Sequence, residues 1–272
     1  MSEELKFWEV YNTNGCLPSP EDDRDFTCAF VNQKEKKFPE EYIVPKRMSV
    51  LSQGGVGSCV AHACATAMGY GEMKSGLEPN NYSRGFIYGN RRDTDHQGEG
   101  MYIRQALKQL NHYGDVLYKD FPWNEKYPDV KKRVDENKDF YLEKAKPYKV
   151  VNYFRCYTEE EVKDTLLNQG AVVMSLTLYD SFAAECPLPK PEDKKRGGHA
   201  MCLVGWDKTG WIIQNSWSAG WGNKGCLHLP YEYPVNEWWG ITVNGELPQP
   251  KKKGIIENLW SWLKTLLKRI FK

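Results

Sequence analysis

The chain changes character near residue 148, and this change limits the folds it can adopt. Residues 45–147 carry helical patterns, whereas residues 148–245 carry short runs suited to strands, separated by turns. Helices followed by strands predict an α+β fold in two parts. The predicted divisions are an N-terminal extension (1–37), a helical part (38–147), a β-rich part (148–247) and a C-terminal segment (248–272).

Local signals place the individual elements. A run of small residues continues without Gly or Pro until Gly69, which favours a tightly packed helix. Thr158 and Glu161 have the spacing of a capping box at a helix start. The predicted helices span 58–69, 102–113 and 159–168, with a charged surface helix within 125–147. The predicted strands span 171–178, 200–206, 210–215, 225–229 and 239–243.

Composition excludes several classes of protein. Hydrophobic residues make up 40% of the 272 residues, enough for a sizeable core and too many for a disordered chain. The net charge of +1 gives no sign of a nucleic-acid partner. Eight cysteines occur without a CxxC pair, so we expect reduced, buried thiols and no metal site. The acidic N-terminus lacks the apolar segment of a secretory signal.

Four polar residues form a pattern suited to nucleophilic chemistry. Cys59 lies at the predicted start of a helix, where free N–H groups and the helix dipole stabilise a thiolate. His199 follows two glycines and directly precedes a predicted strand. Asn215 could accept a hydrogen bond from one imidazole N–H and leave the other nitrogen to act as a base. Gln53, six residues before Cys59, could donate to an oxyanion.

These residues occur in segments that resemble a known family. Residues 53–59 (QGGVGSC), the pair His199–Ala200 and residues 215–225 (NSWSAGWGNKG) are similar in order and spacing to the motifs of the papain-like cysteine peptidases. His199 and Asn215 follow Cys59 by 140 and 156 residues, close to the roughly 130–150 residues typical of that family. The resemblance covers roughly residues 38–245.

The resemblance implies a fold and an activity. The fold has a helical left lobe and an antiparallel β-barrel right lobe, with a cleft between them. The activity is that of a cysteine endopeptidase without a cofactor, acting on polypeptides through Cys59, His199, Asn215 and Gln53. Trp217 would shield the histidine–asparagine bond from water.

The resemblance also implies a substrate site. Gly98 and Gly100 match the family's glycine rim, which pairs with substrate backbone. Gly198 and Ala200 border the cleft, with Ala200 at the base of an apolar pocket for the second residue before the scissile bond.

The chain departs from the family pattern at three places near the motifs. Val56 replaces a disulfide-forming cysteine, Val60 replaces an aromatic residue and Ser218 replaces a glycine. The first change is typical of a disulfide-poor prokaryotic and viral branch, so we expect a cytoplasmic or virion-associated protein. The first 37 residues are too short for the long inhibitory propeptide of lysosomal relatives. We therefore expect no zymogen of that kind, and a short masking N-terminal segment is the alternative.

Two other functions use the same residues. A catalytically silent papain-like scaffold could serve in binding or assembly, attached through the C-terminal segment. A cell-wall amidase or a transglutaminase-like acyl transferase would keep the thiol chemistry and change the bond. The Asn-Ser-Trp segment and Gln53 favour the peptidase over these last two.

The C-terminal segment differs from the rest of the chain. Residues 248–272 carry seven Lys or Arg and one Glu, while residues 1–247 carry 30 basic and 35 acidic residues. Residues 248–254 read as a linker, and apolar residues recur at helical spacing over 255–272. The pattern predicts a basic amphipathic helix that lies on a membrane surface, in the groove of a partner protein or on the body itself.

We predict that deleting residues 248–272 lowers co-sedimentation of the protein with anionic liposomes. The apolar stripe and the basic charges of this segment would otherwise bind the lipid surface. Equal sedimentation of the full-length and shortened chains would exclude membrane binding by this segment.

Overall fold

The computed structural model describes residues 6–11, 13, 15–23, 25–27, 37–91, 99–123, 127–170 and 172–243. Gly98, Cys28 and the predicted amphipathic helix over 255–272 lie outside the described residues. What the sequence predicts for them stays a prediction.

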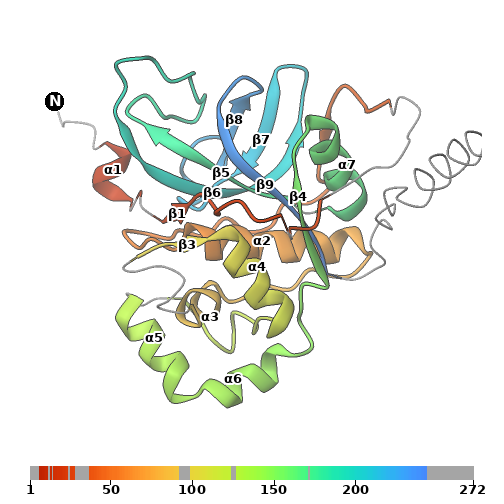
Figure 1. Cartoon of the computed structure of the whole chain (residues 1–272), viewed down its shortest axis with the longest axis vertical. Coiled ribbons are helices and arrows are strands. Elements are labelled where there is room, and N and C mark those ends of the chain that lie inside the picture. The colour runs from red at the N-terminus through yellow and green to blue at the C-terminus, as the bar shows by residue number, and fades with distance from the viewer. Residues whose placement is uncertain are drawn as a thin grey trace, which may run out of the picture.

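An antiparallel sheet forms one side of the molecule (Figure 1). Its strands follow the order β4-β9-β5-β6-β7-β8, and β2 pairs with β6 beside this path. The predicted closure into a barrel is wrong, because no pairing among the described strands joins β4 to β8. The strands are β2 (Tyr42–Ile43), β4 (Asn152–Cys156), β5 (Val172–Tyr179), β6 (Lys195–Trp206), β7 (Gly210–Gln214), β8 (Cys226–Pro230) and β9 (Val235–Thr242).

Helices form the opposite side, with α2 next to the sheet and α3, α5 and α6 farther from it (Figure 1). A short parallel pair, β1 and β3, lies between the two sides (Figure 1). The remaining elements are α1 (Phe7–Val10), β1 (Cys16–Leu17), α2 (Cys59–Lys74), α3 (Arg84–Gly89), β3 (Met101–Tyr102), α4 (Ile103–His112), α5 (Tyr127–Glu136), α6 (Lys138–Ala145) and α7 (Glu159–Gln169).

Helix α2 confirms the predicted small-residue helix and extends it to Lys74. The helix continues past Gly69. The space that a side chain would occupy at Gly69 holds Met48, whose Cε lies 2.5 Å from an ideal Cβ. Gly71 faces Val243 in the same way, at 2.6 Å from Cγ2. Both glycines therefore serve close packing, and the helix is buried along nearly its whole length.

The predicted capping box of α7 is confirmed. The Thr158 hydroxyl accepts a hydrogen bond from the Glu161 N–H at 3.2 Å, and the Glu161 carboxylate accepts one from the Thr158 N–H at 3.2 Å. The charged surface helix within 125–147 is two helices, α5 and α6, which meet at Asn137.

The core joins the two sides of the molecule. Trp206, Trp217 and Trp239 are among its largest fully buried side chains. The seven described cysteines are buried and free, as the sequence predicts for reduced thiols. Within the described residues, no helix is both long and apolar enough to cross a bilayer.

We predict that Gly205→Ala destabilises the protein by about 1–3 kcal/mol, the usual cost of overpacking. A Cβ at this position would overlap the carbonyl oxygen of Tyr42, on the strand that pairs with β6. Urea unfolding measures the effect. Gly220→Ala is the matched control, because the nearest atom to its Cβ is 3.7 Å away. Equal midpoints for the two variants would contradict this account.

Candidate active site

Cys59 is the first residue of α2, and its sulfur lies against β6. The Ala200 N–H donates a hydrogen bond to Cys59 Sγ at 3.4 Å. The backbone N–H groups of Cys59 and Val60 also act on this sulfur and lower its pKa. These N–H groups belong to the first turn of α2, where backbone donors have no partner within the helix. The sulfur therefore lies among donors that would stabilise a negative charge.

His199 and Asn215 form the hydrogen bond that the sequence suggests. His199 lies within β6 and Asn215 follows β7. Asn215 Oδ1 lies 2.7 Å from His199 Nε2 and also accepts from the Ser216 N–H at 2.7 Å. The Ser216 bond fixes Oδ1 as the acceptor, so Nε2 carries the imidazole proton. His199 Nδ1 is left with its lone pair, and it has no hydrogen-bond partner among the described residues.

Trp217 covers this hydrogen bond. Its ring lies 4.8 Å from the His199 ring, centroid to centroid, with 31° between the planes. Trp217 is fully buried. The position agrees with the shielding that the resemblance implies.

Gln53 lies on the other side of Ser216. The Ser216 hydroxyl donates to Gln53 Oε1 at 2.7 Å, and the Gln53 backbone N–H donates to the Ser216 carbonyl at 2.9 Å. Gln53 Nε2 donates to the carbonyl of Val56 at 3.0 Å, within the loop that leads to Cys59. Ser216 therefore holds both the asparagine and the glutamine, a role that the sequence did not reveal.

The N-terminal strap, defined here by residues 6–11, 13, 15–23 and 25–27, runs between the sheet and helix α2 (Figure 1). An ideal Cβ on Gly15 would lie 2.6 Å from Cys59 Sγ and 3.1 Å from the carbonyl oxygen of Gly57. The Met101 N–H donates to the Gly15 carbonyl at 3.1 Å, and Cys16 pairs with Met101 in the parallel β1–β3 ladder. Only a residue without a side chain fits this close to the sulfur.

Aromatic rings hold the first part of the strap. The Tyr11 ring stacks on Trp217 at 4.6 Å with 2° between the planes, and its hydroxyl donates to the Trp217 carbonyl at 3.1 Å. Phe7 also stacks on Trp217, at 5.4 Å. The Arg196 guanidinium lies 4.1 Å from the centre of the Trp8 ring.

Polar contacts hold the second part of the strap. The Ser19 N–H donates to Glu237 Oε1 at 3.2 Å. Asp25 forms a two-point ion pair with Arg104, and both side chains are largely buried. The Arg155 N–H donates to the Phe26 carbonyl at 2.8 Å. The strap is thus fixed on both sides of Gly15.

The covered site keeps its thiol and imidazole neutral. Cys59 and His199 have no exposed surface. Burial raises the pKa of Cys59 to about 12, although N–H groups, led by that of Ala200, act in the opposite direction. Burial lowers the pKa of His199 to about 4, against the effect of Asn215. Burial disfavours both charged forms, so the thiol and the imidazole are neutral in this arrangement.

Gly100, one of the predicted substrate-rim residues, makes its backbone hydrogen bonds within the helical side. The Gly100 N–H donates to the Tyr88 hydroxyl at 3.1 Å, and its carbonyl accepts from Arg91. Gly100 thus bonds into the helical side, and Met101 makes the backbone pairing with the strap. Gly198 lies against the strap, because a Cβ there would overlap the Cys16 carbonyl oxygen. The sequence reasoning missed Met101.

The replacement of the family glycine by Ser218 has a conformational cost. Ser218 has a φ of +74°, a left-handed conformation that favours glycine. The turn after Trp217 keeps the glycine-type backbone even though this chain has a serine there.

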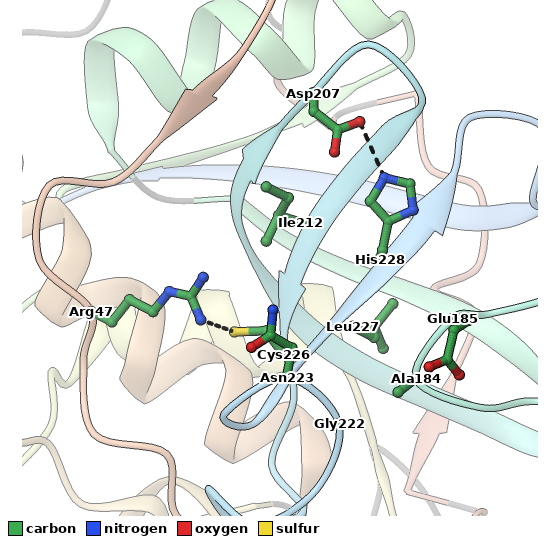
Figure 2. A pocket seen from close by; sticks show the side chains of 10 residues that line it. All are labelled: Arg47, Ala184, Glu185, Asp207, Ile212, Gly222, Asn223, Cys226, Leu227 and His228. Atoms are coloured by element: carbon green, nitrogen blue, oxygen red, sulfur yellow. Dashed lines mark hydrogen bonds and ion pairs between the residues drawn. The ribbon is translucent and has the colours of Figure 1, made fainter.

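A separate cavity of about 480 Å³ lies at the β7–β8 hairpin (Figure 2). Arg47 Nη1 donates to Cys226 Sγ at 3.1 Å on one side, and His228 Nε2 lies 3.1 Å from Asp207 on the other (Figure 2). None of the predicted site residues lines it. Within the described part of the chain, no group of three His, Cys, Asp or Glu side chains is placed to hold a metal ion.

This fold and this set of side chains are those of a cysteine peptidase with a papain-like architecture. The chain belongs to the papain family of cysteine proteases, whose family model matches residues 44–241. An uncharacterized peptidase C1-like protein of Acanthamoeba polyphaga mimivirus is 33% identical over 218 residues, which cover 71% of this chain and 68% of that protein.

Other relatives include a viral and a bacterial protein. A viral cathepsin of Adoxophyes honmai nucleopolyhedrovirus is 27% identical, over 68% of this chain and 54% of its own length. The crystal structure of xylellain, a cysteine protease from Xylella fastidiosa, superposes with a TM-score of 0.74 and 27% identity, covering 86% of this chain and 97% of that one.

We predict that Gly15→Val in the full-length chain speeds alkylation of Cys59 by iodoacetamide at least about tenfold. A loss of about 1.4 kcal/mol in the free energy that holds the strap in place would raise the uncovered fraction by this factor. The added side chain would clash with Cys59 Sγ and displace the strap. Mass spectrometry of the Cys59 peptide measures the rate. Gly220→Val is the control, since its surroundings are open and the residue is exposed. Equal rates for both variants would show that the strap does not protect the thiol.

Proposed function

We propose that this protein is an endopeptidase that cleaves polypeptides through Cys59, His199 and Asn215, with Gln53 in the oxyanion hole. The observation that carries the proposal is the hydrogen-bond set around Ser216. It fixes the Asn215 amide, and with it the imidazole tautomer, at the strand that contacts the Cys59 sulfur. His199 precedes Ala200, whose N–H contacts the sulfur, and its unpartnered Nδ1 is the kind of nitrogen that a general base needs.

Acylation follows from these positions. The Cys59 thiol proton passes to His199 Nδ1, and the sulfur attacks the carbonyl carbon of the scissile peptide as the C=O π electrons move onto oxygen. The Cys59 N–H and Gln53 Nε2 stabilise this oxyanion. When the oxyanion collapses, the C–N bond breaks and His199 gives its proton to the leaving amine. The product is a thioester on Cys59.

Deacylation uses the same groups. A water molecule attacks the thioester carbon while His199 Nδ1 takes its proton. The second oxyanion collapses, the C–S bond breaks and the sulfur recovers its proton from His199. Asn215 keeps the imidazole in one orientation through both steps, and the buried Trp217 keeps water from their hydrogen bond.

The strap makes the covered form latent. A peptide cannot reach Cys59 while Gly15 lies against the sulfur and occupies the Met101 N–H. The strap must therefore be displaced or cut before catalysis. The strap therefore supports the alternative that a short N-terminal segment masks the active site.

We predict that Gly15→Val chains cleave casein and that adding Cys59→Ala abolishes the cleavage. In the same background, Gln53→Ala lowers kcat by ~10²–10³-fold, since an oxyanion donor is lost. Asn215→Ala lowers kcat roughly tenfold or more, because the imidazole loses its orientation. Asn223→Ala, an exposed asparagine nearby in the chain, is the control and should keep full activity.

The alternative is a catalytically silent scaffold. It would show neither casein cleavage nor fast labelling of Cys59 by an epoxide of the E-64 type once the strap is displaced. Cleavage that survives Cys59→Ala would contradict the proposed chemistry altogether.

A further inference from the structure

His62 of α2 is a buried histidine that the proposed chemistry does not use. It is 2% exposed and lies one helical turn after Cys59. Its ring packs at right angles against the Trp123 ring, with 5.7 Å between the centroids and 90° between the planes. A buried polar ring has to find its hydrogen bonds inside the protein, so its partners indicate what it does there.

Both polar contacts of the imidazole belong to Ser58, the residue before the nucleophile. His62 Nδ1 lies 3.0 Å from the Ser58 carbonyl oxygen and 3.3 Å from the Ser58 hydroxyl. The same carbonyl accepts the His62 backbone N–H at 3.1 Å, and its two lone pairs allow both bonds. The Ser58 side chain makes no capping hydrogen bond to the helix, although an N-cap serine normally does. His62 thus holds the Ser58 carbonyl twice, through its backbone and through its ring.

This contact also determines which ring nitrogen carries the proton. The Ser58 carbonyl can only accept, so Nδ1 is the donor. Nε2 keeps its lone pair and has no hydrogen-bond partner among the residues that the structure describes. Burial lowers the pKa of His62 to about 3, and the positive charge of Arg84 acts in the same direction. The ring is therefore neutral near neutral pH, with its one proton on Nδ1.

The Ser58 carbonyl and the Cys59 N–H are the two ends of one planar peptide group. A group that fixes the carbonyl therefore also fixes the direction of the N–H, which points the opposite way. In the covered form this N–H acts on the Cys59 sulfur, and in the proposed mechanism it donates to the oxyanion. A hydrogen bond accepted by the carbonyl also polarises the peptide and strengthens its N–H as a donor.

We propose that His62 is a positioning residue that orients and polarises the Ser58–Cys59 peptide, and thereby strengthens the Cys59 N–H as an oxyanion donor. This inference rests on the proposed function and adds one residue to its machinery. The imidazole acts through the peptide and keeps its proton throughout the reaction. A histidine that served only the packing of α2 against Trp123 would be replaceable by phenylalanine without loss of activity.

The test compares three variants in the full-length Gly15→Val chain. His62→Phe keeps a ring that can pack against Trp123 and removes the Nδ1 donor. His62→Asn places an amide N–H near the position of Nδ1. His112→Phe changes an exposed histidine and is the matched control. Each variant is assayed for peptide cleavage, for binding of a peptide aldehyde and for labelling of Cys59 by an epoxide of the E-64 type.

We expect His62→Phe to lower kcat about three- to tenfold, a modest part of the ~10²–10³-fold that a whole oxyanion donor contributes, with KM nearly unchanged. Binding of the aldehyde should weaken by the same factor, because its hemithioacetal with Cys59 places an oxygen among the same donors. Epoxide labelling should keep its rate, since that reaction attacks no carbonyl. His62→Asn should recover most of the loss, and His112→Phe should behave as the parent does.

The possible results separate clearly. Parent-like kcat and aldehyde affinity in His62→Phe would overturn the inference, and so would a His62→Asn variant that is no better. Epoxide labelling that slows in step with kcat would also overturn it, because the start of the helix would then have moved. If His62→Phe fails to fold, His62→Leu removes the donor with a smaller side chain and carries the same expectations. A Gly15→Val parent that neither cleaves the peptide nor labels quickly would contradict the proposed function, and this inference with it.

Discussion

The contact between Cys59 and Ala200 joins the two halves of this molecule at the point where chemistry would occur. The sulfur comes from the first turn of a buried helix, and the N–H that meets it comes from the central strand of the sheet. Because α2 is made of small residues, it can lie close enough to β6 for this contact to form. Substitutions that push α2 away from the sheet would separate the thiol from the imidazole without touching either residue.

Burial decides the electrostatic state of the site. The N–H donors around Cys59 favour the thiolate, and the Asn215 carbonyl favours the protonated imidazole of His199. Burial under the strap outweighs both effects and keeps the two groups neutral. A desolvated ion pair needs strong compensation to form. In the proposed mechanism, the same residues are therefore inert under the strap and reactive once water and a peptide enter. The groups proposed to carry the chemistry and the groups that cover them come from distant parts of the chain.

Sequence reasoning predicted the elements whose signals are local. The capping residues of α7, the small residues of α2 and the two motifs around Cys59 and Asn215 are contiguous stretches, and each was found. A short masking segment was only an alternative in the sequence analysis. Its path was not predicted, since the contact of Tyr11 with Trp217 spans 206 residues and leaves no local pattern. The barrel was expected from the family resemblance. The resemblance does not show whether the edge strands of this chain pair with each other, and the strand order shows that they do not.

The sequence contains a signal for the inward position of Glu237, whose carboxylate accepts a hydrogen bond from the Ser19 N–H of the strap. In β9 the residues at alternate positions Glu237, Trp239 and Ile241 are all buried, so the acidic residue lies on the apolar face of its strand. The sequence analysis predicts this strand only from 239 onward. Its pairing with β5 extends it back to Val235 and turns Glu237 inward. Tertiary pairing here overrides local propensity.

The strap and the site that it covers belong to the same chain, and this connection sets the effective concentration of the strap at the site. A segment held near its site by a short connection acts as though present at about millimolar concentration, however dilute the protein is. A free peptide then binds with an affinity reduced by the fraction of molecules whose groove is open. Dilution cannot activate such an enzyme, whereas a single break between strap and body would turn the covering segment into an ordinary ligand that diffuses away.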